Sequence, residues 1–222
     1  MSNLKKELMS ISPIMEPLIS ESTTIEGALL QLGRGLISGL SKAKMNFLIK
    51  GLSSDYDIDN KVEELLKCIK SSEENENLIA TLFRQVSNSE SPKVCVIFGL
   101  VIADHLKDDF KVSHEELILC KALESATDYD LNNFKIIMEK FIIENSYGRK
   151  VELSSELNSI ESYISTCDWC VNNRIFKTLP AEYSEEDESL IIENQYYATK
   201  TSDALYNYLK RAKILWDEDK AI

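Results

Sequence analysis

The sequence predicts a mainly α-helical protein, built as a multi-helix bundle around one central apolar helix at about residues 92–107. Residues 94–103 have no polar face, so a helix through them must be surrounded by other elements. Hydrophobic residues make up 44% of the 222-residue chain, which is enough to bury a full core. Only 7 Gly and 4 Pro are present, too few for the many turns of a sandwich or barrel. These observations favour helices over strands.

The chain begins with a segment that shows no clear hydrophobic period. Residues 1–23 contain Pro13 and Pro17, and we expect them to form an N-terminal arm. A helical domain over residues 24–146 follows, and its first helix starts near Thr24 with leucines at helical spacing. The apolar face of this helix continues to Gly51, where a C-cap is predicted.

Four glycines, at positions 27, 33, 35 and 39, interrupt this first helix. Each destabilises a helix by about 1 kcal/mol relative to alanine, so the segment must be held by close packing. We expect it to pack on the central helix. Docking of residues 25–41 on another protein or on a second copy is the alternative, and membrane contact is less favoured. Gly33, Arg34 and Gly35 are therefore candidate partner-binding residues.

The middle of the chain reads as a series of helices with clear start signals. Helices are predicted at about 58–70, 73–87 and 92–107, the last opened by Ser91 as N-cap and Pro92 as first residue. A capping box of Ser113 and Glu116 starts the next helix. Asp128 or Asp130 is predicted to cap a further helix over 131–145.

The character of the chain changes near its end, where we expect a helix-hairpin-helix module over residues 147–222, packed on the helical domain. This module is predicted to contain a turn at 147–150, a helix at about 155–173, strands at 175–179 and 190–197, and a final helix that begins at Thr199 or Thr201. The loop between the strands contains the acidic residues Glu185, Glu186, Asp187 and Glu188, which are further candidates for partner binding.

This order of elements, ending in the sequence YYATKTSDALYNYL, resembles a winged-helix module over about residues 113–213. The resemblance implies binding of DNA or protein. A helix and wing that read DNA need basic residues, whereas this helix contains Glu161 and Asp168 and this wing is acidic. Protein is therefore the favoured partner, and a regulator that binds nucleic acid is the alternative function.

A second resemblance covers the central helix and the helix after it. Residues 94–131, VCVIFGLVIADHLKDDFKVSHEELILCKALESATDYDL, resemble the helical middle of small uncharacterised bacterial proteins that are often carried on prophages and other mobile elements. The resemblance implies a bacterial or phage origin and a role in phage–host conflict. It implies no catalytic residue.

The charge of the chain is uneven. The net charge is −12; residues 1–52 hold six basic and four acidic side chains, so the remaining 170 residues hold 19 and 33, a net −14. Such a body repels phosphate backbones and anionic lipid, which disfavours nonspecific nucleic-acid binding. Five cysteines at irregular spacing are typical of reduced thiols, and no signal-peptide pattern opens the chain, so we expect a cytoplasmic protein.

Few residues in the sequence are candidates for catalysis, redox activity or metal binding. Cys167 and Cys170 form the only CxxC; we expect them to be core residues, with a redox couple or half of a zinc site as alternatives. His105, with Asp109 or with Asp104 and Asp108, could form a small metal or acid–base cluster, although an exposed helix end explains it equally well. Phosphate-binding and nucleophile-elbow glycine motifs are absent from the sequence. We therefore predict no catalytic residue, cofactor or metal, and a protein that acts by binding another protein.

Overall fold

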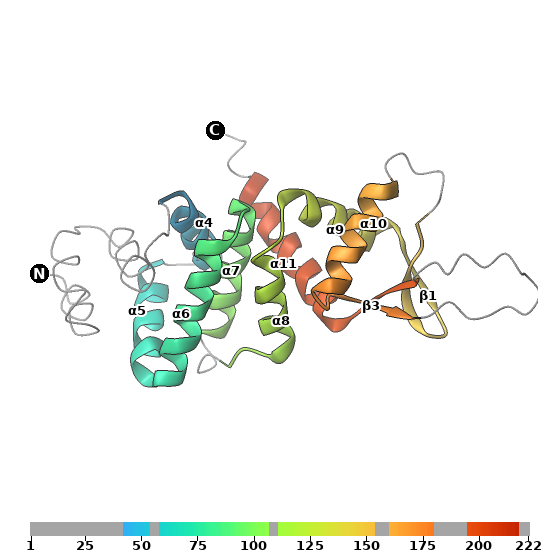
Figure 1. Cartoon of the computed structure of the whole chain (residues 1–222). Coiled ribbons are helices and arrows are strands. Elements are labelled where there is room, and N and C mark those ends of the chain that lie inside the picture. The colour runs from blue at the N-terminus through green and yellow to red at the C-terminus, as the bar shows by residue number, and fades with distance from the viewer. Residues whose placement is uncertain (1–41, 54–57, 107–110, 154–159, 180–194, 218–222) are drawn as a thin grey trace, which may run out of the picture.

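The computed structural model describes residues 42–53, 58–106, 111–153, 160–179 and 195–217. The helices in these ranges are α4 (Lys42–Leu52), α5 (Ile58–Ser71), α6 (Glu73–Asn88), α7 (Pro92–His105), α8 (His114–Leu123), α9 (Asp128–Lys140), α10 (Ile160–Asn172) and α11 (Lys200–Asp217). The strands are β1 (Ile142–Asn145), β2 (Gly148–Val151), β3 (Phe176–Leu179) and β4 (Gln195–Ala198). Figure 1 shows the sheet at one end of the helices. The predicted mainly helical class is confirmed.

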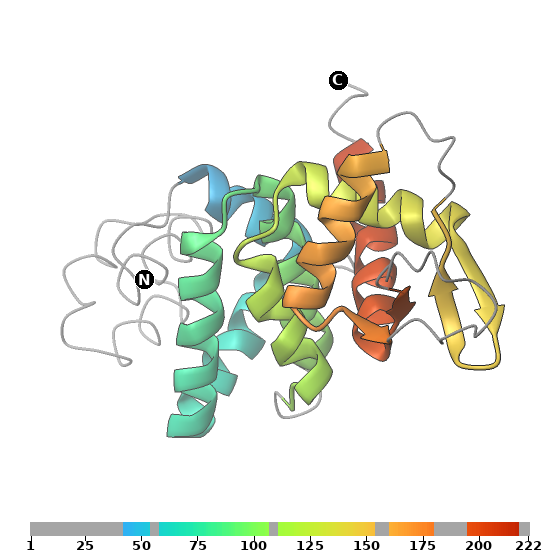
Figure 2. The same ribbon diagram turned by 45° about the vertical axis from the view of Figure 1, so that its right-hand side comes forward.

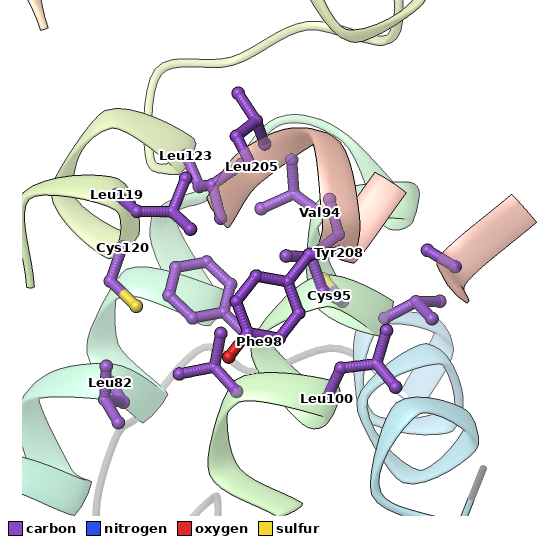
Figure 3. Close-up of a cluster of buried hydrophobic side chains, with 14 of the residues drawn as sticks. Leu82, Val94, Cys95, Phe98, Leu100, Leu119, Cys120, Leu123, Leu205 and Tyr208 are labelled. Atoms are coloured by element: carbon purple, nitrogen blue, oxygen red, sulfur yellow. The ribbon is translucent and has the colours of Figure 1, made fainter. Parts of the chain in front are cut away.

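Helix α7 is the centre of the core. Ser91 is its N-cap, with Oγ accepting from the N–H of Lys93 at 3.2 Å, and Pro92 is its first residue, as predicted. Every residue from Val94 to Ala103 is buried. Figure 3 shows Phe98 among side chains from α6, α8 and α11. An all-round apolar sequence therefore forms a helix that is covered on all sides, as expected.

Helix α4 crosses α7 at a pair of glycines. Gly51 was expected to cap a helix, but α4 continues through it to Leu52, and Gly51 packs against Gly99 of α7. The prediction was wrong because a glycine near a helix end can serve close packing as well as a C-cap. The N-terminal arm and residues 25–41 lie outside the described residues, so the packing of their glycines stays a prediction.

The starts of α8 and α9 are both capping boxes. Ser113 and Glu116 form the predicted one. The N-cap of α9 is Thr127, whose Oγ1 accepts from the N–H of Asp130 at 3.2 Å while the Asp130 carboxylate accepts from the N–H of Thr127 at 3.0 Å. Asp130 is therefore the third helical residue of the box rather than the cap, and Asp128 is the first residue of the helix.

The helix predicted over 131–145 is shorter than expected, and a hairpin follows it. Helix α9 ends at Lys140, and the next residues form β1, which pairs antiparallel with β2 through a two-residue turn. Gly148 has φ of 122°, a conformation that glycine adopts easily, and it closes this turn. The predicted domain boundary between residues 146 and 147 falls inside the same turn.

The predicted C-terminal hairpin is part of a larger sheet. Strands β3 and β4 pair antiparallel, in register from Phe176 opposite Ala198 to Leu179 opposite Gln195. Strand β2 pairs with β4, so the order across the sheet is β1-β2-β4-β3. Residues 190–194 of the second predicted strand lie outside the described residues.

Helix α11 joins the sheet to the central helices. Helix α11 leaves the sheet directly after β4 and packs on α7, α8 and α9. Figure 2 shows the β1–β2 hairpin standing apart from the helices. The buried residues Leu205, Leu209 and Ala212 of α11 belong to the same apolar core as α7.

Candidate functional site

Polar side chains from three helices meet at the C-terminal end of α7. His105 is the last residue of α7, Glu116 lies in the first turn of α8, and Tyr208 projects from α11. The Glu116 Oε1 atom lies 2.9 Å from His105 Nε2 and accepts a hydrogen bond from the Tyr208 hydroxyl at 3.1 Å. The exposed fractions of the His105 and Glu116 side chains are only 14% and 17%.

The other oxygen of Glu116 belongs to the capping box. Oε2 accepts from the N–H of Ser113 at 3.0 Å and from the Ser113 hydroxyl at 2.7 Å. Burial alone would raise the pKa of Glu116, but the hydrogen bonds from Ser113 and His105 outweigh it and hold this pKa below its ordinary value. Glu116 is therefore ionised at neutral pH and accepts hydrogen bonds from two other helices and its own cap.

Beside this carboxylate, α11 and α7 are joined by a second charged pair. The Arg211 guanidinium donates two hydrogen bonds to Asp104, at 2.6 and 2.9 Å, in the bidentate geometry that favours arginine over lysine. The same guanidinium lies 5.6 Å from the centroid of the Tyr208 ring. Burial, and then the negative charges of Asp104 and Glu116, raise the pKa of Tyr208, so its hydroxyl stays a hydrogen-bond donor.

The contacts of His105 differ from those of the metal or acid–base cluster that was expected there. His105 contacts Glu116 rather than Asp104, whose carboxylate is held by Arg211; Asp108 and Asp109 lie outside the described residues. In the ranges that the structure describes, no group of three or more His, Cys, Asp or Glu side chains could hold a metal ion. The arrangement joins α7, α8 and α11, and each named contact is one that holds a helix in place.

The two cysteines of the CxxC are core residues, which confirms the expected packing. Cys167 and Cys170 lie on α10 with no exposed surface. Burial, followed by the charge of Asp168, raises the pKa of Cys167 to about 12, and burial raises the pKa of Cys170 strongly. Thiols with raised pKa values are poor nucleophiles and poor metal ligands at neutral pH.

The predicted partner-binding residues lie outside the described residues. This holds for Gly33, Arg34 and Gly35 and for the acidic residues Glu185, Glu186, Asp187 and Glu188. Their assignment stays a prediction.

The sheet presents a surface that the sequence analysis missed. One face packs on helices: Phe176 lies 5.7 Å from the ring of Phe134, and the Tyr196 hydroxyl donates to Asp168 at 2.7 Å. The opposite face carries the directly paired row Ile143, Lys150, Tyr197 and Lys177, one residue from each strand. Its signal in the sequence was the pair of isoleucines before Asn145, which we assigned to the end of a helix.

Comparison of the chain with protein-family models, with curated proteins and with solved structures finds no match. Among the described helices, none combines the length and apolar character needed to cross a membrane.

Proposed function

We propose that this protein acts by binding another protein, and that the β1–β2 hairpin is part of the binding surface. The observation that supports the proposal is the pair of large apolar side chains on this hairpin: Ile143 is 39% exposed and Tyr147 is 52% exposed. The hairpin stands apart from the helices in Figure 2, and the exposed fractions of both side chains leave them accessible to a partner.

The chemistry of the hairpin fits a protein partner. Tyrosine is enriched at the energetic centres of protein interfaces because its ring buries much area at low entropic cost. Within the described part of the sheet, β1 is an edge strand, paired on one side with β2 only. Such an edge offers backbone groups to a strand of a partner.

The resemblance of residues 94–131 to proteins carried on prophages supports a bacterial protein as the partner, in phage–host conflict. A partner protein, rather than a small substrate, also agrees with the role of the His105–Glu116–Tyr208 cluster, whose described hydrogen bonds join helices. The protein would then act through its surface.

The test is capture from a bacterial lysate on immobilised protein, read by quantitative mass spectrometry. The double variant Ile143→Ser/Tyr147→Ser should lose a protein that the wild type captures. The matched control is Leu117→Ser/Tyr129→Ser, which removes one aliphatic residue and one tyrosine that are 40% and 55% exposed on α8 and α9. Equal capture by the wild type and both variants would contradict the proposal.

A further inference from the structure

The face of the sheet that is turned away from the core has its own charge. Register places eight residues on it: Ile143, Asn145, Gly148, Lys150, Lys177, Leu179, Gln195 and Tyr197. Two are lysines and none is acidic, in a chain whose net charge is −12. Among the described strand residues of this face, the charged side chains are thus all positive, on an acidic protein.

The lysines lie on either side of one tyrosine. Lys150 and Lys177 are the direct cross-strand neighbours of Tyr197, and the Lys177 Nζ atom lies 5.9 Å from the centroid of its ring. The Tyr197 hydroxyl donates to Gln195 Oε1 at 3.0 Å and accepts from Asn145 Nδ2 at 3.4 Å. These contacts fix the ring within the sheet, between the two lysines.

An apolar side chain extends this charged row. Ile143 follows Lys150 at the β1 edge and is 39% exposed, whereas Ile142, on the other face, packs against the core. The row therefore combines two cationic side chains with one aliphatic contact. An extended peptide whose acidic and apolar residues occupy every second position, and so lie on one side, has the complementary pattern, since every second side chain of an extended chain points to the same side.

We propose that this face binds an acidic, extended segment of the partner protein, with Lys150 and Lys177 contacting its carboxylates and Ile143 contacting an apolar residue. The inference rests on the proposed function and adds the chemistry of the partner to it. The supporting argument is charge complementarity with the two lysines that flank Tyr197, beside the exposed side chain of Ile143.

Nucleic acid is the less suitable occupant of the same face. Single-stranded nucleic acid is bound by stacking its bases on exposed aromatic rings, and Tyr197 is only 2% exposed.

The experiment measures binding of a fluorescein-labelled peptide that repeats Glu-Ser-Val-Ser, which places glutamate and valine on one side of the extended chain, by fluorescence anisotropy at low and high salt. A peptide that repeats Lys-Ser-Val-Ser and a short oligothymidylate are the comparison probes. The wild type should bind the acidic peptide alone, more weakly at high salt. Lys150→Glu/Lys177→Glu should weaken binding about tenfold or more, the scale of two exposed charge contacts. Circular dichroism checks that each variant is folded.

The matched control reverses two lysines elsewhere. Lys67 and Lys70 are exposed on α5, and Lys67→Glu/Lys70→Glu should leave peptide binding unchanged. Equal loss in both double variants, no binding by the wild type, or equal binding of the oligothymidylate overturns the proposal. Binding seen only after Glu185, Glu186, Asp187 and Glu188 are replaced by amides would assign the face to the chain's own acidic residues, which also overturns it.

The two proposals fail in different ways. Loss of lysate capture in the hairpin double variant, together with no binding of the acidic peptide, would retain the hairpin as an interface and remove the acidic character of its partner. Peptide binding without hairpin-dependent capture would instead retain the acidic character of the partner and remove the exposed side chains of the hairpin, Ile143 and Tyr147, as the site that captures it.

Discussion

Gly51 of α4 and Gly99 of α7 lie against each other where the two helices cross. A Cβ atom added to Gly51 would lie 2.1 Å from the carbonyl oxygen of Val96 and 2.9 Å from the Cα of Gly99. One added to Gly99 would lie 2.2 Å from the carbonyl oxygen of Leu48. Because these neighbours are backbone atoms, neither can turn aside, and the separation of the helices depends on both glycines.

Gly51→Ala and Gly99→Ala should therefore each destabilise the protein, although alanine favours a helix by about 1 kcal/mol. Overpacking of a close contact costs about 1 to 3 kcal/mol beyond that gain. Urea unfolding followed by circular dichroism measures the change. Asn46→Ala, at an exposed position of α4, is the control and should shift the free energy of unfolding by less than about 0.5 kcal/mol. A stabilised Gly99→Ala variant would show that the helices separate freely.

A charge in the centre of α7 should prevent folding. Phe98 and Val101 have no exposed surface, so Phe98→Asp or Val101→Asp places an unpaired carboxylate in the core, at a cost of several kcal/mol. Loss of the cooperative thermal transition is the expected result. Phe98→Leu, which keeps the site apolar, should fold with a loss of about 1 to 3 kcal/mol. Wild-type melting of either aspartate variant would contradict the buried position of α7.

The stability of the protein should fall in acid because of Glu116. Its pKa is lowered in the folded state, so its ionised form stabilises the fold above the unfolded value of about 4.3, and this contribution is lost as the pH falls through the folded pKa. Glu116→Gln should cost about 1 to 3 kcal/mol at neutral pH, through hydrogen bonds to a charged acceptor, and this difference should shrink below about pH 4. Urea midpoints across this pH range measure it.

Glu115→Gln, one residue earlier on α8, is the matched control for that series. Its unfolding midpoint should follow the wild type at each pH. A difference between Glu116→Gln and wild type that stays constant down to acid pH would mean that the carboxylate charge is not the cause.

All five cysteines should be unreactive in the folded protein. Each is buried, and burial raises the pKa of Cys120 to about 12, as it does for Cys167. A cysteine reacts as its thiolate, and only where the reagent can reach it. The raised pKa prevents formation of the thiolate, and burial prevents access of the reagent. Titration with a disulfide reagent at mildly alkaline pH should detect no rapid thiol in the native protein and five in denaturant. Rapid reaction of Cys167 or Cys170, mapped by mass spectrometry, would restore the redox alternative.

The helical part of the fold could be predicted because its signals are local. Ser91 with Pro92 and Ser113 with Glu116 begin helices through hydrogen bonds within one turn, and the sequence of α7 leaves it no exposed face. The β1–β2 hairpin could not be predicted in the same way. Ile142 and Ile143 suit a helix or a strand, and the pairing of β2 with β4 joins Lys150 to Tyr197, which lies 47 residues further along the chain.

The contacts among His105, Glu116 and Tyr208 could not be predicted from the sequence for the same reason, because they are not local. His105 was a visible candidate, but its partner Glu116 lies 11 residues away and was already explained by its capping box. Tyr208 lies 92 residues beyond Glu116, and nothing in the sequence relates the two. Side chains that meet only through packing of α7, α8 and α11 are found from the structure.

The position of α11 after all the elements that it holds has a consequence for biosynthesis. Arg211 follows its partner Asp104 by 107 residues. At about 5 to 20 residues per second, a ribosome needs on the order of 5 to 20 s to add them. During that interval the apolar surfaces of α7 and α8 that α11 later covers face the solvent of the cell. Exposed apolar surface of this kind makes a nascent chain prone to aggregation until the covering helix is made.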